Sequence, residues 1–158
     1  MAPKTIHRET KPLEPVELRH VMGDVYVTIQ QKADYIEAKW SGHITADEVV
    51  SAAQAYLELV RSSGCSKLLN DKSDVTGDWE EANDWLQYEW LPRAKEAGLR
   101  FLAHVYSFNM FSKLAARELQ ERVSPELCMK NFHERHQAEE WLSQWDASAP
   151  ANRRAATT

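Results

Sequence analysis

Cysteine and glycine are scarce in this chain of 158 residues, and each shortage excludes a class of protein. The two cysteines, Cys65 and Cys128, are too few for a disulfide scaffold and too far apart for a CxxC redox or zinc motif, so we expect both to be reduced and structural. Five glycines leave little material for phosphate-binding loops, and the motifs GxGxxG and GxxxxGK are absent. A GxSxG nucleophile motif is absent as well. The chain therefore lacks the common sequence signatures of an enzyme, and we expect no cofactor.

Positive charge and long apolar runs are also lacking. The 19 lysines and arginines are outnumbered by 24 aspartates and glutamates, which gives a net charge of -5. A nucleic-acid-binding protein usually concentrates basic residues on one face, and no basic cluster is present, so we expect no nucleic-acid partner. No apolar run approaches the roughly 18 residues that cross a bilayer, and residues 1–12 lack the apolar segment of a signal peptide. We therefore expect a cytoplasmic protein without a membrane span.

The composition favours one globular domain. Hydrophobic residues make up 43% of the chain and charged residues 27%, which are ordinary values for a folded protein. Three prolines and scattered charge near the start predict an N-terminal arm over residues 1–22. Residues 147–158 are small, polar and aperiodic, which predicts a disordered tail. The domain itself is expected over residues 23–146.

Hydrophobic periodicity predicts the order of the elements. Val25–Gln30 and Tyr35–Trp40 alternate apolar and polar residues, as in an antiparallel hairpin. Thr45 and Glu48 form a capping box at the start of a helix that Gly64 ends. The later strands are expected at 67–70, 101–106 and 129–132, and the later helices at 79–98 with a kink at Pro92, at 111–123 and at 138–145. The resulting order, ββαβαβαβα, predicts an α/β fold with an open mixed sheet and parallel crossovers.

Several segments between residues 24 and 145 form a recognisable pattern: Leu68–Asp71, Val75–Trp79, Asp84–Trp85, Pro92–Ala94 with Ala97–Gly98, and Phe132 with Ala138–Leu142. With these segments the chain resembles the STAS-like superfamily, the fold of the bacterial sporulation anti-anti-sigma factor, and more narrowly a group of bacterial STAS or CRAL-TRIO-like proteins of unassigned function. This resemblance implies a STAS-like mixed sheet packed by helices. It also implies a non-catalytic module that acts by interaction or sensing.

The phosphorylation site of the anti-anti-sigma branch is altered in this chain. In that branch an Asp-Ser pair starts the helix after the third strand, and a partner kinase phosphorylates the serine. Matching Asp71 to the end of the strand puts Asp78 on the family aspartate and Trp79 on the family serine. Because an indole cannot accept a phosphoryl group, that switch does not carry over. Ser73 and Thr76 lie in the same segment, and Ser73 is the candidate phosphorylation site.

The segment Asn70–Asp78 is a candidate loop for a ligand or a partner, because it follows a strand at the edge where open α/β sheets bind ligands. Its candidate residues are Asp71, Ser73, Thr76 and Asp78. The same residues are typical of turns and helix caps, and that interpretation stays open. The spacing of the carboxylates is not that of an EF-hand, so we predict no metal site. His133 and His136 are expected at a solvated helix end, and His104 in the core.

The helix that starts at Trp79 carries aromatic residues on two faces. At 100 degrees per residue, Trp79, Leu86 and Trp90 share one face, whereas Trp85 and Tyr88 lie roughly opposite. One helix cannot pack both faces on one sheet. Trp85 and Tyr88 therefore contact another part of the chain, a second copy at a homodimer interface or a bound apolar ligand.

These features predict a non-catalytic, cytoplasmic STAS-like interaction or regulatory module. We expect a homodimer through the aromatic helix and allow for a regulatory protein partner. The alternative is a binder of a small apolar ligand or lipid in a CRAL-TRIO-like groove. An enzyme that uses the segment from Asp71 to Asp78 ranks third.

Overall fold

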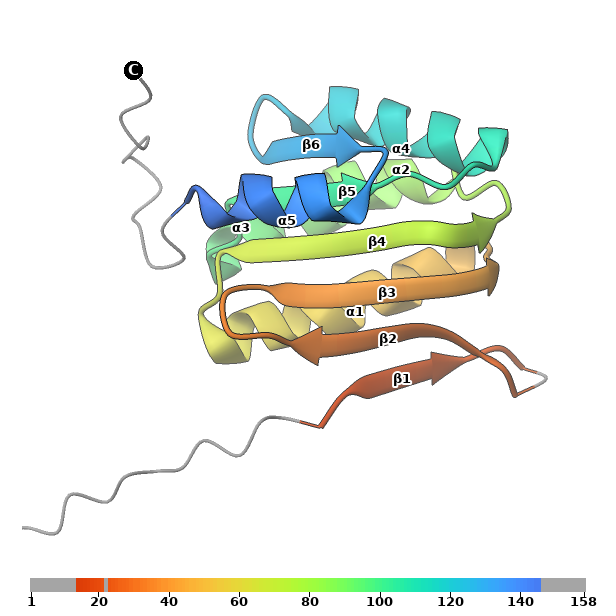
Figure 1. Ribbon diagram of the computed structural model, residues 1–158, viewed down its shortest axis with the longest axis horizontal. Helices are drawn as coiled ribbons and strands as arrows, with labels where there is room; N and C mark the ends of the chain where they lie inside the picture. Colours follow the sequence, from red (N-terminus) through yellow and green to blue (C-terminus); the bar gives the residue numbers. More distant parts are fainter. Residues whose placement is uncertain (1–13, 22, 146–158) are drawn as a thin grey trace, which may run out of the picture.

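A six-stranded sheet organises the chain in the computed structural model, which describes residues 14–21 and 23–145 (Figure 1). The first three strands pair antiparallel and the last four pair parallel, in the spatial order β1-β2-β3-β4-β5-β6. The strands are β1 (Val16–Arg19), β2 (Val25–Gln31), β3 (Ile36–His43), β4 (Lys67–Thr76), β5 (Phe101–Val105) and β6 (Cys128–Phe132). The predicted α/β class with an open mixed sheet is confirmed.

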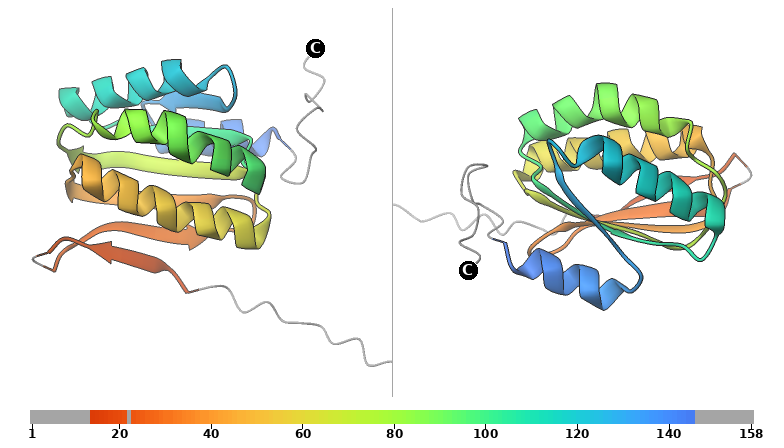
Figure 2. Two further views of the ribbon diagram at one scale, coloured as in Figure 1. Left: turned by 180° about the vertical axis from the view of Figure 1, so that it is seen from behind. Right: turned by 90° about the horizontal axis from the view of Figure 1, so that it is seen from above.

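Helices cover both faces of this sheet (Figure 2). They are α1 (Ala46–Ser63), α2 (Ala82–Trp85), the π-helix η1 (Leu86–Trp90), α3 (Leu91–Ala97), α4 (Met110–Val123) and α5 (Arg135–Ser143). Each parallel crossover moves one strand further in the same direction, and right-handed crossovers of that kind put their helices on one face. Accordingly α1, α2–α3 and α4 lie together, and α5, which follows the last strand, packs on the opposite face.

The sheet contains one strand more than the sequence predicts. Residues 1–22 are predicted to be an arm, but β1 pairs with β2 and places Val16 opposite Ile29. The strand is only four residues long and directly follows Pro15, so its alternation is too short to stand out from the proline-containing segment before it. The remainder of the predicted arm up to residue 13, and the predicted tail 147–158, lie outside the described residues.

Both predicted boundaries of α1 and the predicted end of α3 are set by the expected capping residues. The Thr45 side chain accepts a hydrogen bond from the Glu48 backbone, and the Glu48 carboxylate accepts one from the Thr45 backbone, which completes the capping box. Gly64 ends α1 with φ of 68°, and Gly98 ends α3 with φ of 109°. Both glycines adopt the left-handed conformation that terminates helices.

Two local predictions are corrected. The predicted loop at 70–78 is largely strand, because β4 continues to Thr76, where its polar side chains find partners on β3 and α5. The expected kink at Pro92 is instead a π-helical turn before it, in which the Leu91 N–H donates to the Leu86 carbonyl. Pro92 follows as the second residue of α3, which continues the π-helical turn without a break.

Candidate functional site

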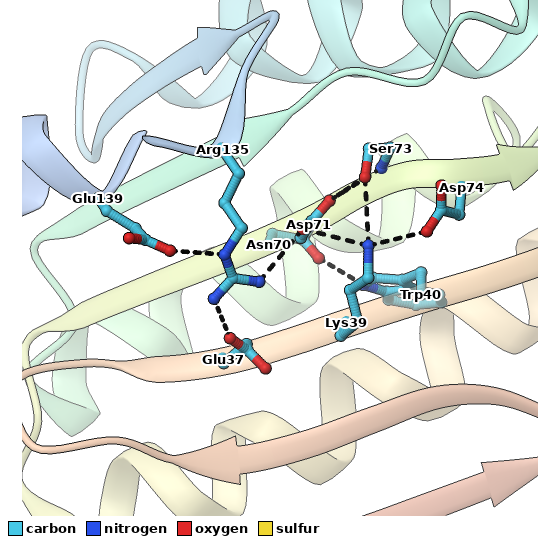
Figure 3. Close-up of polar contacts among 9 residues, drawn as sticks. All are labelled: Glu37, Lys39, Trp40, Asn70, Asp71, Ser73, Asp74, Arg135 and Glu139. Carbon is cyan, nitrogen blue, oxygen red and sulfur yellow. Dashed lines mark hydrogen bonds and ion pairs between the residues drawn. The ribbon is translucent and has the colours of Figure 1, made fainter. Parts of the chain in front are cut away.

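Charged side chains from three elements meet on the α5 face of the sheet (Figure 3). We call them the polar network: Glu37 and Lys39 from β3, Asp71, Ser73 and Asp74 from β4, and Arg135 and Glu139 from α5. Two cations are thus shared among four carboxylates.

Asp71 is the centre of the polar network, and its side chain is only 2% exposed. One of its oxygens, Oδ2, accepts from Lys39 Nζ at 3.3 Å and from Arg135 Nη1 at 3.2 Å. The other, Oδ1, accepts from the Ser73 backbone N–H at 3.0 Å and from Ser73 Oγ at 2.6 Å. Burial alone raises the pKa of Asp71, but the Ser73 hydrogen bonds and Lys39 outweigh it, so the pKa is lowered. Asp71 is therefore an ionised carboxylate with donors on both oxygens, which suits it to holding structure rather than to taking up a proton.

Arg135 ties α5 to the sheet. Its guanidinium donates to Glu139 at 2.6 Å, to Asp71 at 3.2 Å and to Glu37. Although burial lowers the pKa of Arg135, its hydrogen bonds to Glu37 and Glu139 raise it above its usual value. The sequence analysis missed Arg135 because Glu37 is 98 residues away and no local pattern marks the pair. Its place in the charged run 133–136 suggested only a solvated helix end.

The predicted loop residues separate into two groups. Asp71 and Ser73 lie together in the polar network. Thr76 ends β4, where its hydroxyl is 3.2 Å from His43 Nδ1, and Asp78 accepts from the Glu80 backbone in the following turn. Ser73 donates to a buried carboxylate from within a strand, so a phosphate there would stand beside Asp71 and Asp74. Phosphorylation of Ser73 stays a prediction.

The predicted aromatic helix begins at Ala82 and not at Trp79, but the predicted buried face is present. Trp79, Leu86 and Trp90 lie in the core, and the indole of Trp90 donates to the Ala53 carbonyl at 3.1 Å. On the other side, Trp85 is half-buried and packs against the core, whereas Tyr88 is 68% exposed. The role of these two residues in an interface stays a prediction.

A second polar centre, which the sequence analysis missed, is buried on the opposite face of the sheet, beneath the crossover helices. It contains Lys72 from β4, which follows Asp71 and points the other way. The Lys72 Nζ lies 3.5 Å from the ring centroid of Trp79 and 4.6 Å from that of Trp40. Burial lowers the pKa of Lys72 well below its usual value. The buried position of His104, in the same centre, is as predicted.

Large apolar side chains gather at the start of α4. Phe108, Met110, Phe111 and Leu114 are 102%, 69%, 60% and 54% exposed, and we call them the α4 patch. Met110 and Phe111 precede Leu114 by four and three residues, so the three share one side of the helix. The sequence analysis predicts a helix over residues 111–123, but it did not single out these apolar residues, which a helical pattern could have identified.

Two classes of site are not found in the described part of the chain. None of its helices is long and apolar enough to cross a membrane. Residues 14–21 and 23–145 also contain no group of three or more histidine, cysteine, aspartate or glutamate side chains that could hold a metal ion.

The chain is similar in structure to proteins of known structure. No protein-family model matches the chain, and no curated protein matches it significantly. A similar solved structure is that of an uncharacterized protein from the DUF3478 family, with a SpoIIAA-like fold, from Shewanella loihica. The two chains are 17% identical with a TM-score of 0.43, over 73% of this chain and 91% of that one.

Proposed function

We propose that this chain is a non-catalytic interaction module that self-associates through the α4 patch. The observation that carries the proposal is the exposure of four large apolar side chains within the seven residues from Phe108 to Leu114, in a chain that buries most of its other apolar residues. Contiguous apolar surface of this kind marks interaction sites in folded proteins. Phenylalanine and methionine are also among the residues enriched at protein interfaces.

A second copy of the chain is the occupant that the surrounding charges favour. Arg117, one helical turn after Leu114, is exposed and has no ion-pair partner among the described residues. Glu80 and Glu118 lie close enough for Glu118 to raise the pKa of Glu80 through a hydrogen bond and charge repulsion. The patch is thus flanked by an unpaired cation and by excess negative charge. In a dimer with two-fold symmetry, Arg117 of each copy would face the Glu80 and Glu118 carboxylates of the other copy.

The polar network supports the non-catalytic part of the proposal. Both oxygens of Asp71 already accept hydrogen bonds, and Arg135 is engaged by three carboxylates. A general base or an anion-binding arginine needs a free atom that faces substrate. These groups instead fix α5 on the sheet. We place the protein in the cytoplasm, where its two free thiols, of which Cys128 is exposed, would stay reduced.

The dimer is tested by sedimentation velocity over a range of concentrations, with wild type and the double variant Phe111→Ser, Leu114→Ser. We expect the variant to dissociate at a concentration at least about tenfold higher, because each buried anchor at an interface contributes on the order of 1–2 kcal/mol. Arg117→Glu should weaken the dimer as well, and more at low salt than at high salt.

Two single variants serve as matched controls. Val21→Ser removes an exposed apolar residue between β1 and β2 and should leave the dimer unchanged. Tyr88→Ser tests the interface that the sequence analysis predicts, together with Trp85. A wild type that stays monomeric at high micromolar concentration, or a dimer that only Tyr88→Ser weakens, would overturn the proposal for the α4 patch.

A small apolar ligand or lipid remains the alternative occupant of the α4 patch. Native mass spectrometry of the purified protein separates the two, because it reports both the subunit count and any bound small molecule. A monomer that carries an adduct, lost in Phe111→Ser, Leu114→Ser, would replace the dimer with the ligand-binding function.

A further inference from the structure

Lys72 is buried without a counter-ion. Its side chain is 1% exposed, and the described residues give it no carboxylate partner. The adjacent Asp71 points to the opposite face, where Lys39 and Arg135 hold it. What surrounds the Lys72 Nζ is aromatic: the Trp79 ring centroid lies at 3.5 Å and the Trp40 centroid at 4.6 Å.

The two indoles are held in place by hydrogen bonds. Trp40 Nε1 donates to Asn70 Oδ1 at 2.5 Å, and Trp79 Nε1 donates to Ser112 Oγ at 2.9 Å. Because each indole N–H is already engaged, neither ring can turn freely. Lys72 thus lies in a fixed aromatic box that contains no compensating negative charge.

His104 adds an unused polar atom to this box. Its ring centroid is 6.2 Å from that of Trp79, and its Nδ1 lies 3.4 Å from Asn70 Nδ2. The amide donates to Nδ1, so we assign the proton of the neutral ring to Nε2. Nε2 is buried and has no hydrogen-bond partner. Burial, and secondly the charge of Lys72, lower the pKa of His104 well below its usual value, so the ring stays neutral.

We propose that Lys72 is a nucleophilic amine that binds small apolar aldehydes covalently, as an imine, in the box formed by Trp40, Trp79 and His104. An uncharged amine in a desolvated apolar site is the form of lysine that attacks carbonyl carbons. The lowered pKa of Lys72 supports this form. The indole faces favour an apolar substituent on the aldehyde.

The reaction balances without an oxidant or a reductant. The Nζ lone pair adds to the carbonyl carbon, and the carbonyl oxygen gains a proton to give a carbinolamine. The hydroxyl then leaves, and the two hydrogens that Nζ loses depart with the oxygen as water. The Nε2–H of His104 is the donor within the box that can hydrogen-bond to this oxygen as negative charge develops on it.

Access to Lys72 requires movement of Trp79. This residue lies in the segment 77–81, between β4 and α2, which is neither helix nor strand. Its side chain is anchored to α4 by the hydrogen bond to Ser112. Ser112→Ala removes this bond with little change of volume, so it should loosen the cover while the fold is retained.

The test is reductive trapping with propanal and sodium cyanoborohydride at pH 7, followed by peptide mapping by mass spectrometry. Lys67 is a matched internal control, because its side chain is fully buried but its Nζ is paired with Asp34 at 2.8 Å. We expect Lys72 to be labelled at least about tenfold faster than Lys67, since each unit of pKa changes the uncharged amine fraction tenfold. The rate at Lys72 should rise in Ser112→Ala.

Variants of His104 separate its donor role from packing. His104→Phe should slow labelling of Lys72 about tenfold or more, whereas His104→Gln, which keeps an N–H donor, should slow it less. Lys72→Met should lose the adduct from this peptide. If Lys72 is labelled no faster than Lys67 in both wild type and Ser112→Ala, with the fold intact by circular dichroism, the proposal is wrong. Sedimentation of the same samples reports the dimer separately, so the two proposals can fail independently.

Discussion

Gly77 and Gly64 both have positive φ, but only Gly77 is closely surrounded. A Cβ at Gly77, with φ of 112°, would lie 2.3 Å from the carbonyl oxygen of Ile44, whereas a Cβ at Gly64, with φ of 68°, would meet nothing within 4 Å. Gly77 is also the first residue of the segment 77–81, which carries Trp79 over Lys72. At this residue, backbone conformation and close packing both require glycine.

Gly77→Ala should therefore lower the free energy of unfolding by about 3 kcal/mol, because the Ile44 backbone has to move. Gly64→Ala is the control and should cost about 1 kcal/mol, the penalty for a left-handed alanine. Urea denaturation measures both. Equal losses in the two variants would contradict the close contact at Gly77.

Lys72 makes stability depend on pH in an unusual direction. Because burial lowers its pKa in the folded state, the unfolded chain binds the proton more readily between that lowered pKa and the ordinary value near 10.5. The contribution of Lys72 to the free energy of unfolding therefore rises with pH between these two pKa values. Above the pKa that Lys72 has in the unfolded chain, it rises no further. His104 acts in the same sense at lower pH, because its pKa is also lowered by burial.

Lys72→Met should remove this dependence. We expect the variant to be more stable than wild type at pH 7 by about 1 kcal/mol or more, since methionine fills a similar volume without burying an amine. The slope of stability against pH between pH 7 and 10 should fall by up to about 1.4 kcal/mol per pH unit. Lys39→Met, at a half-exposed lysine paired with Asp71 and Asp74, should not reduce that slope. Parallel pH profiles for wild type and Lys72→Met would show that the amine stays charged in the fold.

Among the elements, α5 depends on the polar network at its first residue and on apolar packing along its length. Arg135 joins it to Glu37 and Asp71, while Ala138 and Leu142 pack against Leu69 and its neighbours on the sheet. The helix has no side-chain cap at its N-terminus, so the Arg135 contacts are what fixes that end. The contacts that hold α5 on the sheet can therefore be weakened without disrupting the core beneath the crossover helices.

Arg135→Met should loosen α5 without unfolding the sheet. The loss of contacts to the nearly buried Asp71 should cost about 2 kcal/mol, less than for a fully buried pair, because Arg135 is 35% exposed. Hydrogen exchange should accelerate over residues 135–143 while β4 and β5 stay protected. Arg61→Met, which removes an exposed pair with Glu58 on α1, is the control. Uniform acceleration across the chain would mean that α5 unfolds together with the sheet.

For the whole molecule, the parts that could be predicted from the sequence are those with local signals. Periodicity and the capping residues Thr45, Gly64 and Gly98 located the helices, and alternation located β2 and β3. The length of β4 could not be predicted, because Asp71 and Ser73 resemble a turn until Lys39 and Arg135 are brought beside them. The aldehyde site was missed for a related reason. Nothing near Lys72 in the sequence shows that Trp40 and His104 will enclose it.

The strand order of the sheet also bears on how the chain folds. Every strand lies next to the strand that precedes it in the sequence, from β1 to β6 (Figure 1). No strand therefore has to insert between two strands that come before it in the sequence. The sheet can therefore grow at one edge as the chain leaves the ribosome, each new strand pairing with the last. This strand order allows folding to proceed in the direction of synthesis, with α5 covering the second face after β6 has paired.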